Sequence, residues 1–172
     1  MVMDHSQISL QKQQARKQAK QVRKYLHANQ RNIAAQHLLQ FAPDLIDKFT
    51  SSIVAGFLPI FTEIDIIPLM TALAEKHCQL CLPVTPEKPS ALRFRAYFPG
   101  QELEAGPLNT KHPDASSNQL IPELVLLPLL AFDMRYNRLG YGGGDFDKKN
   151  KKIFETGLVV KNVGGGFFFF FF

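Results

Sequence analysis

A glycine-rich segment, residues 137–147 (NRLGYGGGDFD), contains the residue types best suited to bind a phosphate group. Its glycines can adopt positive φ and leave successive backbone N–H groups uncovered, which favours an anion-binding nest. Arg138 adds a cationic fork suited to phosphate, and Asp147 adds a carboxylate suited to Mg²⁺. The segment therefore predicts a nucleotide-phosphate site. A glycine-rich surface turn is the alternative, because the spacing is neither that of the P-loop nor that of the dinucleotide fingerprint.

The residues on either side of this segment favour the phosphate site. Residues 124–132 form an apolar run after Pro122 and predict a buried strand that ends at Asp133. The lysine-rich residues 148–152 could begin a helix behind the glycines. Open α/β sheets present phosphates in this order of strand, acidic turn, glycine-rich loop and helix.

The same stretch resembles a known family. Residues 127–133 (LPLLAFD), residues 137–144 (NRLGYGGG) and Asp147 resemble the signature of the 5-formyltetrahydrofolate cyclo-ligase family, also called methenyltetrahydrofolate synthetase. The resemblance implies an enzyme that uses ATP and Mg²⁺ to close 5-formyltetrahydrofolate, with one or several glutamates, into 5,10-methenyltetrahydrofolate. It implies that Asp147 holds the metal and that Asp133 orients the loop.

The resemblance also implies a set of nucleotide contacts in the loop, with Arg138 as a catalytic cation. The implied ATP-binding residues of this segment are Arg138, Leu139, Gly140, Tyr141, Gly142, Gly143, Gly144, Asp145 and Phe146. Asp145 departs from the family pattern, because the family usually has an aromatic residue there. A carboxylate beside bound phosphates would repel them unless it faced outward or bound Mg²⁺.

The N-terminal segment predicts a basic helix that is capped by Ser6 and runs to about His27. One stripe of this helix is apolar (Ala15, Ala19, Val22, Leu26), and a parallel stripe is basic (Lys12, Arg16, Lys20, Lys24). A solvated charged face is the ordinary meaning of such a stripe. The family resemblance implies instead that a Lys-x-x-x-Arg element, here Lys12 and Arg16, contacts ATP, with Lys12 catalytic. The pair Arg16 and Lys20 is a competing frame.

A turn near residue 60 carries the second group of candidate residues. Residues 51–59 predict a buried strand and residues 64–76 a following helix, so Glu63 lies where ligands bind beyond the carboxyl ends of parallel strands. Capping that helix is the alternative role for Glu63 or Asp65. The resemblance implies that Leu58 and Glu63 contact the folate.

The remaining patterns predict a single α/β domain over residues 1–163, a three-layer α/β/α, Rossmann-like fold with a mixed, mainly parallel sheet. The further expected elements are a helix over about 31–41, capped by Asn29 and ended by Pro43, a helical continuation to Phe49, a strand over 77–84, an antiparallel strand over 91–98 and a polar loop over 106–119. Within that loop His112 precedes Pro113, where the family usually has a glutamate, which weakens any folate contact assigned to the loop.

The net charge of +5 admits a polyanionic partner. A nucleic-acid-binding module is therefore a rival interpretation, although ATP and polyglutamylated folate are also polyanions. Cys78 and Cys81 form a CxxC beside His77, but no second ligand pair follows, so two strand cysteines are expected rather than a metal or redox site. With no apolar span and a polar start, we expect a cytoplasmic protein, and the resemblance suggests a monomer.

The C-terminal end departs from the family pattern. Residues 156–160 could form a strand, but residues 164–172 (GGGFFFFFF) have no amphipathic period and would be prone to aggregate. The family continues after Asp147 with a helix, a core strand and an acidic site residue that are not recognisable here. A truncated relative that binds nucleotide without turnover is therefore a further alternative to an active cyclo-ligase.

Overall fold

The computed structural model describes residues 4–85, 92–132, 138–140, 158–163 and 167–171. Its main sheet has the strand order β10-β11-β7-β1-β2-β3-β6. These strands are β1 (Ile53–Ala55), β2 (Gln79–Val84), β3 (Arg93–Tyr97), β6 (Gln119–Leu120), β7 (Leu124–Leu127), β10 (Leu158–Val163) and β11 (Phe167–Phe171). Two short pairs lie apart from the main sheet, β4 (Glu104–Ala105) with β5 (Lys111–His112) and β8 (Ala131–Phe132) with β9 (Arg138–Leu139).

The centre of the sheet is parallel and its flanks are antiparallel. β1 pairs in parallel with β2 on one side and with β7 on the other, so that Ala55 lies between Cys81 and Val125. On the flanks, β3 and β6 continue the sheet beyond β2, and β11 and β10 continue it beyond β7, each with antiparallel pairing. This confirms the predicted α/β class with a mixed sheet. The Gly/Phe end contributes β11 to the same sheet.

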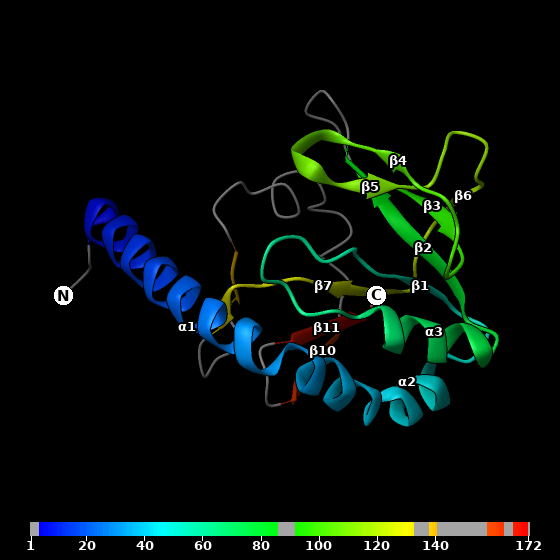
Figure 1. The fold of residues 1–172 in the computed structure, drawn as a ribbon, viewed down its shortest axis with the longest axis horizontal. Coiled ribbons are helices and arrows are strands. Elements are labelled where there is room, and N and C mark those ends of the chain that lie inside the picture. The colour runs from blue at the N-terminus through cyan, green and yellow to red at the C-terminus, as the bar shows by residue number, and fades with distance from the viewer. Residues whose placement is uncertain (1–3, 86–91, 133–137, 141–157, 164–166, 172) are drawn as a thin grey trace.

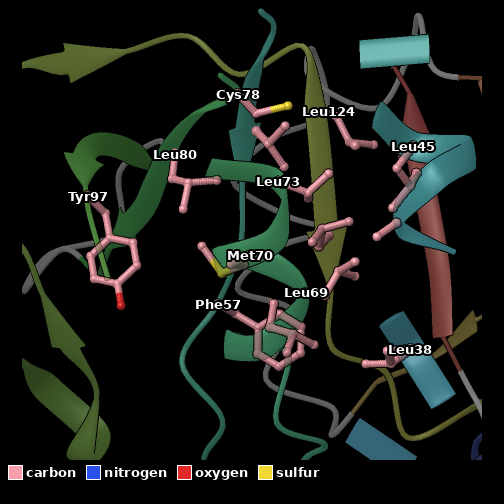
Figure 2. Close-up of a cluster of buried hydrophobic side chains, with 14 of the residues drawn as sticks. Leu38, Leu45, Phe57, Leu69, Met70, Leu73, Cys78, Leu80, Tyr97 and Leu124 are labelled. Atoms are coloured by element: carbon pink, nitrogen blue, oxygen red, sulfur yellow. The ribbon is translucent and has the colours of Figure 1, made fainter. Parts of the chain in front are cut away.

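Three helices, α1 (His5–Leu39), α2 (Ala42–Phe49) and α3 (Ile67–Glu75), cover one face of the sheet (Figure 1). Figure 2 shows the core between the helices and the sheet, a single cluster that contains Leu38 of α1, Leu45 of α2, Leu73 of α3 and Leu124 of β7. Each fully buried leucine stabilises the fold by about 1.5–3 kcal/mol. The other face carries a smaller core in which Phe94, Val125 and Leu127 take part. The helix expected over residues 148–152, which would belong to a third layer, lies outside the described residues.

The two helices predicted at the N-terminus form the single helix α1, so the break expected near Asn29 is wrong. Residues 5–40 contain no glycine or proline, and the Asn29 side chain donates its Nδ2–H to the carbonyl oxygen of Tyr25 at 2.7 Å within the helix. The cap position is Asp4 rather than Ser6, and Pro43 lies in the first turn of α2, where its missing N–H costs nothing. The N-terminal half of α1 projects from the rest of the fold (Figure 1).

The apolar stripe predicted for this helix faces a cavity rather than the packed core, because Ala19, Val22 and Leu26 line that cavity. Val22 and Leu26 are 57% and 42% exposed, whereas Arg16, Arg23 and His27 are half-buried. The half-buried Arg16 and Arg23 make hydrogen bonds to distant segments, which a stripe of apolar residues cannot reveal. α1 is long enough to cross a bilayer but too polar to do so, and no other described helix combines the needed length and apolar content.

Most of the other predicted elements are present with shorter bounds, but the run 124–132 is divided into β7 and β8, and the strand expected over 156–160 is β10, which begins later and ends at Val163. One prediction differs more. The loop predicted over residues 106–119 contains regular structure, since a 3₁₀ turn (Pro107–Asn109) connects β4 to β5 and β6 begins at Gln119. Arg95 of β3 anchors the segment by donating an Nη1–H to the carbonyl oxygen of Pro113 at 2.9 Å. Such a short polar hairpin lacks the apolar alternation that marks a strand in a sequence.

Candidate active site

A cavity of about 520 Å³ opens beyond the carboxyl ends of β1 and β7. Its walls are one face of α1, the turn between β1 and α3, and the segment that follows β7. Its volume lies in the range of small-molecule sites. The lining residues that carry polar or aromatic groups include Arg23, His27, Arg31, Phe57 and Glu63. The cavity lies where open α/β sheets bind their ligands, between neighbouring parallel strands.

Glu63 is the buried charged side chain of the part of the chain that the structure describes, with 5% of its surface exposed. Its Oε2 accepts a hydrogen bond from the backbone N–H of Ile60 at 3.0 Å, inside the same turn. Burial raises the pKa of this carboxyl, while the Ile60 N–H and the positive charge of Arg23 act in the opposite direction. Glu63 does not cap α3, because Asp65 accepts the first N–H of that helix, from Ile67, at 2.9 Å. The carboxyl group can therefore serve as a hydrogen-bond acceptor for a ligand in the cavity.

Of the two residues that were predicted to contact folate, only one lines the cavity. Glu63 lines the cavity, but Leu58 does not, and the half-buried Leu58 side chain packs against the main core. The neighbouring Phe57 lines the cavity instead. A role for Leu58 in folate binding stays a prediction.

Arg16 brings the basic helix to the start of the glycine-rich segment. Its Nε–H donates to the carbonyl oxygen of Gly140 at 3.0 Å, across 124 residues of sequence. Gly140 follows β9, which is formed by Arg138 and Leu139. Lys12 lies one turn earlier on α1 and is exposed. Asp133 and the remaining loop residues predicted to bind nucleotide or metal, 141–147, lie outside the described residues.

Arg23 was not among the predicted site residues, yet it lines the cavity together with Glu63. Its Nη1–H donates to the carbonyl oxygen of Leu129 at 3.1 Å, in the segment after β7. The sequence did contain a signal, because Arg23 follows Arg16 by seven residues and therefore lies on the same face of the helix about two turns later. The predicted basic stripe of Lys12, Arg16, Lys20 and Lys24 does not include Arg23.

The CxxC cysteines lie on opposite faces of the sheet and cannot share a ligand. Cys78 packs in the core under the helices and Cys81 in the core of the other face, both as free thiols. Burial raises the pKa of Cys81 to about 12 and also raises that of Cys78. Within the described residues, no group of three or more His, Cys, Asp or Glu side chains is placed to hold a metal ion.

Fold and site together define an α/β protein with a small-molecule cavity at the carboxyl edge of a parallel sheet and a cationic helix beside it. Residues 8–160 match the family model described as the 5-formyltetrahydrofolate cyclo-ligase family, so the chain belongs to this family of enzymes. The resemblance seen in the sequence is thereby confirmed.

Two curated relatives carry the same name. The chain is 28% identical over 160 residues to the 5-formyltetrahydrofolate cyclo-ligase of Haemophilus influenzae, covering 87% of this chain and 86% of the relative. It is 31% identical over 120 residues to that of Escherichia coli, covering 67% of this chain and 64% of the relative.

Two solved structures share the fold. The NMR structure of the Aquifex aeolicus 5,10-methenyltetrahydrofolate synthetase has a TM-score of 0.66 at 24% identity, over 79% of this chain and 70% of that one. The 5,10-methenyltetrahydrofolate synthetase of Mycoplasma pneumoniae has a TM-score of 0.64 at 19% identity, over 84% of this chain and 80% of that one. Both confirm the α/β architecture with a mixed central sheet.

Proposed function

We propose that this chain catalyses the ATP- and Mg²⁺-dependent cyclisation of 5-formyltetrahydrofolate to 5,10-methenyltetrahydrofolate. The observation that carries the proposal is the hydrogen bond from Arg16 to Gly140, because it joins the basic helix to the start of the glycine-rich segment beside the cavity of Glu63. The family and the names of the curated relatives support the same activity.

The chemistry explains why ATP is needed. The formyl oxygen is a poor leaving group until it takes the γ-phosphoryl group of ATP, with ADP as the product of that step. The second folate nitrogen then attacks the activated carbon, loses its proton and expels phosphate, which carries away the formyl oxygen. Such transfers depend on positioning and charge neutralisation rather than on an enzyme nucleophile. We therefore assign no covalent catalyst.

The residues divide into two groups in this proposal. Arg138, Lys12 and Arg16 neutralise the charge of the transferring phosphoryl group, and the backbone N–H groups of residues 139–146 hold the phosphates. Glu63 accepts hydrogen bonds from the pterin ring, and Leu58 supports the ring from the same turn. The half-buried Arg16 already lies at Gly140, where the glycine-rich segment begins.

Magnesium fits this donor set through Asp147. Mg²⁺ in phosphoryl-transfer sites is usually held by one or two carboxylates together with substrate phosphates, so a preformed protein cluster is not required. When bound with ATP, the ion would neutralise phosphate charge. We expect Asp147→Asn to lower the Mg²⁺-dependent affinity for ATP by about tenfold, with little change in ATP binding without metal. Calorimetric titrations of both proteins test this, and equal affinities with Mg²⁺ would remove Asp147 from the metal site.

The activity itself is tested by following methenyltetrahydrofolate absorbance with purified protein, 5-formyltetrahydrofolate, ATP and Mg²⁺, omitting each component in turn. We expect a signal that requires all of them. Absence of turnover in protein shown to be folded by circular dichroism would overturn the proposal. If the folded protein still bound ATP, the chain would be a binding relative without catalysis.

Arg138 offers a mutational test of the phosphoryl-transfer role. Losing one positioned charge in the transition state typically costs tenfold or more in rate, so we expect Arg138→Ala to reduce kcat by about tenfold or more. Arg138→Lys should retain part of the activity because it keeps the charge but not the fork. The unfolding temperatures of both variants serve as the fold control, and an unchanged kcat in Arg138→Ala would exclude the role.

We infer that the catalytic unit is a monomer in the cytoplasm, where it would meet both ATP and reduced folates. Its domain extends beyond the predicted bound of residue 163, because β11 (Phe167–Phe171) pairs with β7 in the main sheet. We infer that the substrate carries one or several glutamates. Light scattering tests the monomeric state, and a comparison of mono- and polyglutamylated substrates tests the preference for glutamates.

A further inference from the structure

We propose that Arg23 is a positioning residue for the cyclisation, holding Glu63 and the segment after β7 in the geometry that accepts the folate. This inference rests on the proposed function. It concerns a residue that neither the glycine-rich motif nor the Lys-x-x-x-Arg element contains.

The first support is the place of Arg23 between two walls of the cavity. Its side chain reaches from α1 to the carbonyl oxygen of Leu129 at 3.1 Å, and Arg23, Glu63 and Leu129 all line the same cavity. The next residue, Leu130, donates its N–H to the carbonyl oxygen of Leu139 at 2.9 Å. Arg23 thus fixes the position of α1 relative to Leu129 and Leu130, the residues that precede β8 and contact β9.

The second support is the matching contact of Arg16. Arg16 and Arg23 lie on one face of α1 and bind carbonyl oxygens on either side of the β8–β9 pair, Gly140 after β9 and Leu129 before β8. Two arginines from one helix therefore hold both ends of the pair from which the glycine-rich segment emerges. Displacing Arg23 would shift the helix that carries Lys12 and Arg16.

The third support is electrostatic. The charge of Arg23 lowers the pKa of Glu63 and so opposes the effect of burial, which favours the protonated acid. The other titratable side chains that line the cavity, His27, Arg31 and His37, all come from α1. Removing the charge of Arg23 would therefore raise the pKa of Glu63 further, because less would oppose the effect of burial. The carboxylate form, which accepts hydrogen bonds on both oxygens, would then require a higher pH.

The test compares Arg23→Gln, Arg23→Lys and Lys24→Gln. Lys24 is an exposed cation on the same helix that does not line the cavity, so its variant is the matched control for charge and helix content. We expect Arg23→Gln to raise KM for 5-formyltetrahydrofolate by about tenfold and to move the acid limb of kcat/KM to higher pH. Arg23→Lys should keep the acid limb of the wild type, and Lys24→Gln should match the wild type in both respects.

A second measurement is independent of turnover. In the free protein with ¹³C-labelled glutamate, the side-chain carboxyl signal of Glu63, assigned through Glu63→Gln, should titrate at higher pH in Arg23→Gln than in the wild type or Lys24→Gln. An unchanged titration of Glu63 would overturn the electrostatic role, even if the enzyme proved inactive. An unchanged folate KM together with an unchanged acid limb in an active Arg23→Gln enzyme would overturn the positioning role as a whole. A shifted Glu63 titration in a protein without turnover would instead count against the proposed function and leave Arg23 as the partner of Glu63.

Discussion

At the scale of single residues, the burial of Glu63 lowers the stability of the fold but places a hydrogen-bond acceptor inside the cavity. The residue is 5% exposed, and its carboxyl group accepts one backbone hydrogen bond, from Ile60. A carboxylate has about four lone-pair sites, so Glu63 can accept further hydrogen bonds in addition to the one from the turn. Burial raises its pKa, which means that the fold disfavours the charged form.

This placement predicts a pH-dependent gain of stability in Glu63→Gln. Between the ordinary pKa of 4.5 and the raised native value, the unfolded chain has released its proton while the native protein retains it, so stability falls as pH rises through this window. The amide oxygen of glutamine can still accept the Ile60 N–H. At pH 7 we expect the Tm to rise by about 2–4 °C, which corresponds to about 1 kcal/mol in a domain of this size.

The gain should vanish below about pH 4, where both states carry the protonated acid. The same variant should bind 5-formyltetrahydrofolate more weakly. Thermal unfolding across pH 3–8 checks the first expectation and a binding titration the second. A gain of equal size at all pH values would indicate improved packing rather than removal of a buried charge.

At the scale of elements, Gly56 allows β1 to continue into the turn of Glu63 beside α3. A Cβ atom at this position would lie 2.2 Å from the Sδ and 2.6 Å from the Cε of Met70. Met70 of α3 is fully buried, so its side chain cannot move into solvent. The close approach of α3 to the end of β1 therefore depends on the absence of a side chain.

Gly56→Ala should destabilise the protein by about 1–3 kcal/mol through overpacking against Met70. Urea unfolding measures the effect. The double variant with Met70→Ala provides the control, because removing the thioether relieves the clash and the two costs should then be less than additive. Strict additivity would contradict the proposed contact.

Elements were predictable from the sequence to the extent that local patterns decide them. The buried strands β1 and β7 are apolar runs, and the rule for parallel strands placed Glu63 at the cavity without knowledge of its neighbours. The continuity of α1 through Asn29 was predictable, because residues 5–40 contain no glycine or proline. The partners of Arg16 and Arg23 were not predictable, because they lie more than 100 residues away in the sequence. Arg23 was missed for this reason, since an arginine on a basic helix is ordinarily solvated.

At the scale of the whole molecule, the sheet depends on a strand from the Gly/Phe end. β11 pairs antiparallel with β7 over Leu124–Leu127, and β10 joins the sheet through β11. All four residues of β7 are buried. Without β11, one edge of an apolar central strand would present unpaired backbone groups, which favours association between chains.

Deleting residues 164–172 should therefore lower the Tm and produce soluble oligomers or aggregates, even though this segment looks like an aggregation hazard in the sequence. Size-exclusion chromatography with light scattering measures the outcome. A variant that replaces Phe167–Phe171 by valines keeps a strand-forming segment and should remain closer to the starting protein. A monomeric deletion variant with an unchanged Tm would show that the pairing with β7 is dispensable.

The order of the strands in the sheet also has a consequence for the folding pathway. The paired residues of β1 and β2 are about 26 positions apart in the sequence and are joined by the α3 crossover, whereas those of β1 and β7 are about 70 positions apart. Because closing a longer loop costs more entropy before any contact compensates for it, we expect the β1-α3-β2 unit to form first and β7 to dock afterwards. The cavity lies beyond the ends of β1 and β7, so it would be completed only in this late step. Partly folded chains, including those still being synthesised, would then be unable to capture the ligand.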